Sequence, residues 1–155
     1  MANAVFASEA MLGLTNRFRI SVGGVDLGSW ATCQGLGVTF NPVKLEAGGD
    51  YGYEHILPGQ VKYGQVKMTR AMSSKESKVL QDWLSKQSDQ LLAFEGNLAY
   101  EDSHATITLL DAHGGDVIDW HLRGVHANSW TGPSFDASSS KIAVETLELV
   151  HEGFL

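Results

Sequence analysis

Histidines supply much of the reactive chemistry of this chain of 155 residues, which has six of them. Four lie on or between two expected neighbouring strands: His104, His113, His121 and His126. Asp119 and His121 are two residues apart, so on a strand they share a face. A zinc site needs three or four convergent ligands, and no close pair of these histidines has that two-residue strand spacing. The pattern favours solvent-facing strand histidines over a metal site, and we expect no metal and no cofactor.

The nucleophiles carry no recognisable catalytic arrangement. Cys33 is the only cysteine, and no histidine is near it in sequence to activate a thiol, so we expect a small buried residue on a strand. The chain has no Gly-x-Ser-x-Gly elbow, no phosphate loop and no Gly-x-Gly-x-x-Gly after a strand. We therefore expect a protein that is not an enzyme, with a hydrolase or a small-ligand β-barrel as the remote alternative.

Acidic residues in the C-terminal segment pose a different question. Residues 141–151 read as a strand, on which Glu145 shares a face with Leu147 and Glu148 shares the other face with Val150. The two carboxylates cannot both lie in one dry core. Either one face of the sheet is solvated, or the sheet lines a water-filled channel, and the strand pattern does not separate these readings.

Alternating apolar and polar residues predict most of the elements. The expected strands span 17–22, 25–34, 38–45, 61–70, 105–110, 117–127 and 141–151. In the fourth, Gln65 and Lys67 alternate with apolar residues. Ser73 and Glu76 form a capping-box pattern before one amphipathic helix, at about 74–87. The fold class is therefore mainly β, a single domain over 1–155: an antiparallel sandwich or barrel of about seven strands with one flanking helix.

Two segments lack a clear period. Residues 1–15 are expected to form an N-terminal arm. Residues 46–60 read as a long irregular loop, which is uncommon inside a compact domain and is usually functional. This loop carries Tyr51 and Tyr53 together with two aliphatic residues, and such side chains need a surface to bury against. A contact with a partner is therefore favoured over a free solvent loop.

Charge and hydropathy exclude several classes of function. The formal net charge of −7 disfavours nonspecific binding to DNA or to membranes. The apolar runs are too short for a transmembrane helix, so we expect no membrane insertion. The N-terminus lacks the charged start and the long apolar stretch of a secretion signal. We expect synthesis and assembly in the cytoplasm.

An ordered set of motifs runs through nearly the whole chain. In order these are Asn16-Arg-Phe-Arg-Ile-Ser-Val-Gly-Gly, Cys33-Gln-Gly-Leu-Gly-Val, Glu46-Ala-Gly-Gly-Asp, Leu57-Pro-Gly-Gln-Val-Lys-Tyr-Gly, Val66-Lys-Met-Thr-Arg, a helix with Trp83, Ile107-Thr-Leu-Leu-Asp, Trp120, Trp130-Thr-Gly-Pro and Val144-Glu-Thr-Leu-Glu-Leu-Val-His-Glu-Gly. In this set the chain resembles the tail tube (inner tube) protein family of contractile phage tails and phage-derived contractile injection systems.

The resemblance implies an assembly. It implies hexameric rings whose sheets join into one barrel around a lumen, stacked into a tube that is driven through a target envelope and conducts protein cargo or DNA. The implied partners are further copies of the chain, a sheath protein, baseplate or spike proteins and a tube terminator. Contact with the next ring is implied for Glu46, Gly48, Gly49, Asp50, Tyr51 and Tyr53. Candidates to face the lumen are Glu145, Glu148, Gln65 and Lys67.

Several systems remain open within this resemblance. Chain length and the short N-terminal arm favour an injection system over a phage tail, in a particle that can be released from the cell. A tube-initiator paralogue at the baseplate, or a type VI-like secreted ring protein that carries effectors, are the alternatives.

Overall fold

The computed structural model describes residues 16–46, 48–49, 52–92 and 103–155. Its elements are β1 (Phe18–Val22), β2 (Val25–Ser29), β3 (Thr32–Gln34), β4 (Val38–Leu45), β5 (His55–Tyr63), β6 (Val66–Ala71), α1 (Glu76–Leu92), β7 (Ala105–Leu110), β8 (Asp116–Leu122), β9 (His126–Thr131) and β10 (Val144–Val150). The expectation of a mainly β, antiparallel fold with one helix is confirmed.

The described residues contain more strands than the alternation predicts, because three expected strands are each divided in two. Trp30 and Ala31 separate β2 from β3, and Gly64 and Gln65 separate β5 from β6. Between β8 and β9 the chain turns at Gly124, which has a φ of 57°. Alternation continues across such short breaks, so the sequence pattern does not reveal them.

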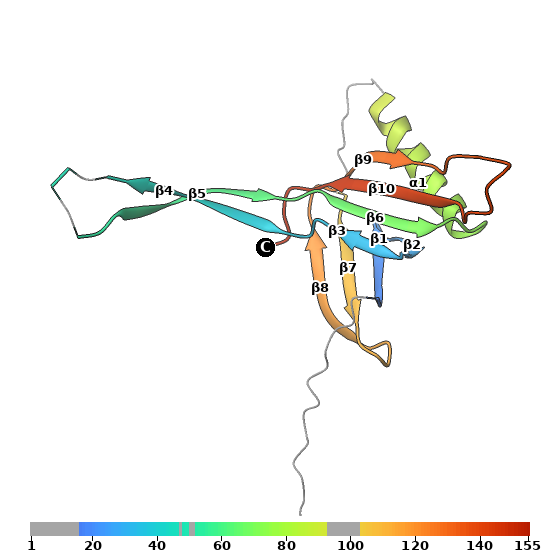
Figure 1. Cartoon of the computed structure of the whole chain (residues 1–155), viewed down its shortest axis with the longest axis horizontal. Helices are drawn as coiled ribbons and strands as arrows, with labels where there is room; N and C mark the ends of the chain where they lie inside the picture. Colours follow the sequence, from blue (N-terminus) through green and yellow to red (C-terminus); the bar gives the residue numbers. More distant parts are fainter. Residues whose placement is uncertain (1–15, 47, 50–51, 93–102) are drawn as a thin grey trace, which may run out of the picture.

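The strands form two four-stranded antiparallel sheets and one separate hairpin (Figure 1). One sheet has the order β2-β1-β7-β8, and we call it the β1–β7 sheet. The other has the order β3-β6-β10-β9, and we call it the β6–β10 sheet. The β4–β5 hairpin pairs only within itself among the described residues and projects from the body of the molecule (Figure 1).

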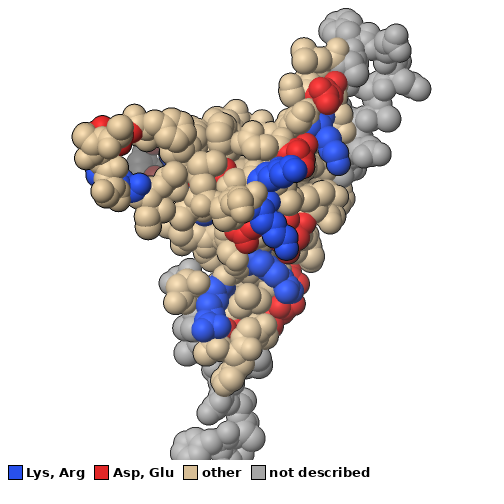
Figure 2. Space-filling model, turned by 90° about the vertical axis from the view of Figure 1, so that its right-hand side faces the viewer, with Lys and Arg blue, Asp and Glu red and all other residues tan. Residues whose placement is uncertain are grey.

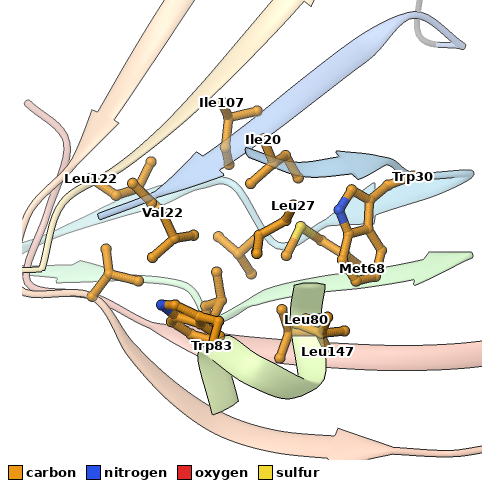
Figure 3. Packing of buried hydrophobic residues seen from close by; sticks show 14 residues of the cluster. Ile20, Val22, Leu27, Trp30, Met68, Leu80, Trp83, Ile107, Leu122 and Leu147 are labelled. Carbon is orange, nitrogen blue, oxygen red and sulfur yellow. The ribbon is translucent and has the colours of Figure 1, made fainter. Parts of the chain in front are cut away.

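The core lies between the two four-stranded sheets, where side chains from both contribute to one cluster (Figure 3). Ile20 and Leu27 of the β1–β7 sheet face Met68 and Leu147 of the β6–β10 sheet, and all four are at most 1% exposed. Helix α1 contacts β2 and β9, the edge strands of the two sheets, and buries Leu80 in the same cluster. The helix therefore closes one open side of the sandwich.

Helix α1 begins at residue 76 and ends at residue 92, whereas the sequence pattern predicted a helix at about 74–87. The backbone N–H of Glu76 donates to Ser73 Oγ at 3.2 Å, as a capping box requires. The Glu76 carboxylate does not return to Ser73; it accepts from the backbone N–H of Ser29 at 3.2 Å instead. At the other end the helix continues to Leu92, beyond the expected end near residue 87, and Leu91 and Leu92 are 78% and 76% exposed. No helix in the described part of the chain is long and apolar enough to cross a membrane.

Candidate assembly surfaces

The β4–β5 hairpin occupies most of the segment that was expected to be an irregular loop. That expectation is wrong for residues 55–60, which pair with β4 from Asn41↔Gln60 to Leu45↔His55. The register shifts between Asn41 and Val43, opposite a Pro-Gly pair that reads as a turn in the sequence. Gly59 is required there, since a Cβ atom would lie 1.4 Å from the carbonyl oxygen of Asn41.

Four of the six residues predicted to contact another ring lie at the tip of this hairpin. Glu46, Gly48, Gly49 and Tyr53 are all exposed there, between the end of β4 and the start of β5. The Tyr53 ring is 63% exposed and lies 4.9 Å from the ring of His55 in an edge-on arrangement. The other two predicted residues, Asp50 and Tyr51, lie outside the described residues. The contact itself stays a prediction.

Apolar side chains are exposed along the whole hairpin. They are Phe40, Val43, Leu45, Tyr53, Ile56, Leu57 and Val61, each between 42% and 63% exposed. Val43 lies opposite Leu57, and Leu45 is two residues further along, so these three share one face. An isolated two-stranded hairpin is marginally stable in water, and a cluster of this kind marks an interaction site. The hairpin thus has the composition of a surface that is completed by a partner.

A second candidate surface is the outer face of the β6–β10 sheet. Lys67 of β6 and Glu148 of β10 are paired across it, with Lys67 Nζ 3.2 Å from Glu148 Oε1. Ser129 Oγ of β9 donates to Glu148 Oε2 at 3.1 Å. The Lys67 ammonium and then the Ser129 hydroxyl hold the pKa of Glu148 below its usual range. Gln65 precedes β6 and is also exposed. Of the four predicted lumen residues, Gln65 and Lys67 are thus exposed, and Glu148 is partly exposed.

The fourth, Glu145, does not face any lumen, and its assignment is corrected. Its side chain is fully buried on the core face of β10. Its carboxylate accepts hydrogen bonds from Arg70 Nε at 2.7 Å, Ser77 Oγ at 2.8 Å and Trp130 Nε1 at 3.1 Å. The alternation that separates Glu145 from Glu148 is therefore right, but it is Glu145 that points inward. The principal partner, Arg70, lies 75 residues earlier in the chain.

Arg70 is buried with equal completeness. Its Nη1 donates to the carbonyl oxygen of Leu27, and its Nη2 donates to that of Glu76 at 3.0 Å. Its guanidinium carbon lies 4.2 Å from the ring centroid of Trp30, a cation–π distance. We call Arg70, Glu145, Ser77 and Trp30, together with Trp130, which is 36% exposed at the edge of the group, the buried ionic cluster. It joins β6, β9 and β10 to the start of α1 and to the end of β2.

A group of aromatic rings, not predicted from the sequence, fixes the base of the hairpin. The Tyr63 ring at the end of β5 lies 5.7 Å from His151 and 5.2 Å from Phe154. The pKa of His151 is lowered by burial, against a smaller opposing effect of the Gly64 and Gly153 backbone. The C-terminal residues thus pack against the point where the hairpin leaves the body.

The histidines and the cysteine show no catalytic arrangement in the described residues. No three His, Cys, Asp or Glu side chains gather there in a way that could hold a metal ion. His121 Nδ1 pairs with the Thr106 hydroxyl at 3.2 Å. Burial raises the pKa of the Cys33 thiol to about 11, which makes it a poor nucleophile.

Comparisons with known proteins show the family and the fold to which the chain is similar. Residues 14–155 match the family described as T4-like virus tail tube protein gp19. A chain of the sheath-tube complex of PVC, an extracellular contractile injection system in its extended state, is 23% identical, with a TM-score of 0.70 and coverage of 93% of this chain and 90% of that one. No curated protein matches the chain.

Two further solved structures share the fold. A chain of the tube-terminating cap of the anti-feeding prophage is 21% identical, with a TM-score of 0.68 and coverage of 97% of this chain and 95% of that one. A chain of the baseplate of the same prophage is 22% identical, with a TM-score of 0.66 and coverage of 91% and 92%.

Proposed function

The chain belongs to the T4-like virus tail tube protein family, and from this membership we propose that it is a structural subunit of the hollow inner tube of a contractile injection system or phage tail. In this proposal residues 1–155 act as one tail-tube domain, without catalytic chemistry. Six copies close into a ring, and rings stack into a tube that conducts protein cargo or DNA when it is driven through a target envelope.

The observation that carries the ring is the open β6–β10 sheet. Its edge strands β3 and β9 have a neighbour on one side only in the described part of the chain. An unpaired edge presents free backbone N–H and C=O groups that invite another strand. Pairing of β3 with β9 of the next subunit would join these sheets. Six copies with four strands each would make a closed barrel of 24 strands.

The outer face of the β6–β10 sheet would then line the lumen. Lys67 and Glu148 neutralise each other across β6 and β10, and Gln65 is uncharged. A polar wall whose charges are paired gives neither a strongly positive nor a strongly negative field. Such a wall suits passage of a cargo, because it holds neither protein nor DNA tightly.

The hairpin would make the contact between rings. Its exposed apolar residues would be buried against the next ring, with Glu46, Gly48, Gly49, Asp50, Tyr51 and Tyr53 at the tip of the contact. Residues 1–15 are a second candidate for this contact. Half-exposed aliphatic side chains that become buried contribute about 1 kcal/mol each, so several per subunit support a stable stack.

The further partners follow from the same proposal. Sheath-tube, baseplate and cap assemblies all contain chains of this fold, which supports a sheath, baseplate or spike proteins and a tube terminator as partners here. The tube would be assembled in the cytoplasm and released within a particle, in an injection system rather than a phage tail. The similarity to a chain of a baseplate supports a second candidate function, that of a tube initiator that forms one ring and does not extend it.

Electron microscopy of the purified protein tests the proposal. We expect rings, and at higher concentration stacked tubes of uniform bore, with sedimentation velocity showing a six-subunit species as the smallest assembly. Single rings that never stack would favour the initiator. A strictly monomeric chain over a wide range of concentration would overturn the tube proposal.

A further inference from the structure

The loop between β9 and β10, residues 132–143, lies at the end of the β6–β10 sheet opposite to the β4–β5 hairpin (Figure 1). The strand register establishes this. At one end of the β6–β10 pair Val144 lies opposite Ala71, and the loop leads into β10 there. At the other end Leu149 lies opposite Val66, and the hairpin joins β6 there. Hairpin and loop are thus at the two ends of the same strands.

The loop is hollowed, and both polar and apolar residues line the hollow. Pro133, Phe135, Ile142 and Val144 line the hollow, and Phe135 is 90% exposed and Ile142 77% exposed. Figure 2 looks onto this end of the molecule, where intermixed acidic and basic side chains run in a band beside a largely uncharged region. Clusters of exposed aromatic and aliphatic residues are unusual on a protein that acts alone.

Hydrogen bonds within the loop hold its rim in shape. The Asp136 carboxylate accepts from the backbone N–H of Ser138 at 3.0 Å and from the Ser138 hydroxyl at 2.7 Å. The backbone N–H of Ser139 donates to the carbonyl oxygen of Asp136 at 3.1 Å. The hollow is therefore formed before any partner arrives, which lowers the ordering cost of binding.

We propose that this hollow receives the β4–β5 hairpin of a second copy of the chain, in the adjacent ring. The inference rests on the proposed function and identifies the receiving surface. Two different patches at opposite ends of one molecule make a heterologous contact, which builds a filament when the rotation between successive copies does not close a ring. In the proposed ring, pairing of β3 with β9 of the next subunit already closes the circle. The contact between hairpin and hollow would therefore connect one ring to the next along the tube.

The two surfaces match in chemistry. Apolar residues of the hairpin, including Tyr53 and Leu57, would bury Phe135 and Ile142. Each surface also carries charges of both signs. The hairpin has Lys44, paired with Glu54 at 3.0 Å, and the hollow is lined by Asp136 and Lys141. Oppositely charged side chains are therefore available to pair across the contact.

A double substitution in the hollow tests the proposal. Phe135→Ser with Ile142→Ser is expected to leave rings intact and to reduce the fraction of protein in tubes at least tenfold. Ile118→Ser, on β8 and 47% exposed, is the matched control and should assemble like the unsubstituted chain. Normal tubes from the double variant would overturn the inference. Unsubstituted protein that forms no rings would overturn the proposed function itself, a separate outcome.

Cross-linking gives a second readout that does not depend on loss of assembly. A chain with Tyr53→Cys and Phe135→Cys is expected to form disulfide-linked ladders under mild oxidation of tubes, and Tyr53→Cys with Ile118→Cys is not. The native Cys33 does not interfere, because burial raises its thiol pKa to about 11. Tubes that form but yield no more ladder than the control pair would show that the hairpin docks elsewhere.

Discussion

The buried ionic cluster and the β4–β5 hairpin distribute charge and apolar surface in opposite ways. Arg70 and Glu145 are at most 2% exposed and find every partner within one chain. Phe40 and Ile56 are each more than 60% exposed, and in the described part of the chain their strands pair only with each other. The two regions therefore differ in whether their side chains find partners within one subunit. The charged groups of the cluster are satisfied within a single subunit, whereas the apolar side chains of the hairpin stay exposed on it.

The largest expected effect comes from breaking the buried ionic cluster. Arg70→Met should lower the free energy of unfolding by about 3–5 kcal/mol, because it leaves the Glu145 carboxylate buried without its ionic partner. Urea denaturation of the unassembled subunit measures the loss. Adding Glu145→Leu to the same chain should restore much of the stability, since replacing both charges by apolar side chains is often neutral. An unchanged urea midpoint for Arg70→Met alone would refute this account.

Gly59→Ala should damage the hairpin and spare the body. The added Cβ would collide with the Asn41 carbonyl oxygen and part β4 from β5 around the bulge. Hydrogen exchange should therefore become faster in β4 and stay slow in β6, while tubes are lost. Gly37→Ala is the matched control, because no atom lies within 4 Å of its added Cβ. Equal protection of β4 in the two variants would contradict the prediction.

Val43→Ser with Leu57→Ser tests the hairpin surface without changing its backbone. Both side chains are exposed, so the free energy of unfolding should change by no more than about 0.5 kcal/mol. Burial of two such side chains between rings would contribute about 2 kcal/mol, so the concentration needed for tubes should rise at least about tenfold. Sedimentation and electron microscopy at matched concentrations measure the shift. A loss in the free energy of unfolding as large as that of Arg70→Met would show that these hairpin side chains stabilise the single subunit, which contradicts the prediction.

The smallest effect is expected at the base of the hairpin, through pH. Burial lowers the pKa of His151, so the unfolded chain binds a proton there more readily than the folded one. The stability contribution is therefore complete above the ordinary histidine pKa of about 6.5 and declines as pH falls below it. His151→Gln should show a smaller drop in melting temperature than the unsubstituted chain between about pH 7.5 and 5.5. Equal drops would remove His151 as the cause.

The sequence pattern predicted the features that depend on residues close together in the chain. The capping residue Ser73 and the helical spacing around Trp83 predicted α1, and alternation predicted the strands of the body and the opposite faces of Glu145 and Glu148. The direction in which each face points was not predictable. It depends on Arg70, which becomes a neighbour of Glu145 only when β6 pairs with β10.

The strand pairing of residues 55–60 in the β4–β5 hairpin was not predicted, for a different reason. Pro58 and Gly59 are typical of turns, and their accommodation in a bulge is a property of the pairing with β4. Exposed apolar residues in that segment did indicate a partner contact, and the structure shows the strands on which they lie. The Tyr63 and His151 contact could not be found from sequence, since the two residues are distant along the chain and neither belongs to a motif with a known geometry.

The junction between hairpin and body determines how the subunit carries force. β3 leads into β4, and β5 into β6, through residues 35–37 and 64–65, and the Gly64 N–H donates to the Gly37 carbonyl oxygen at 3.1 Å across the junction. A pull on the hairpin therefore acts along β6, which is paired with β10 from Val144↔Ala71 to Leu149↔Val66. These pairs are loaded together in shear and are not peeled apart one at a time. The same strands that shape the body thus make it resistant to tension along its length.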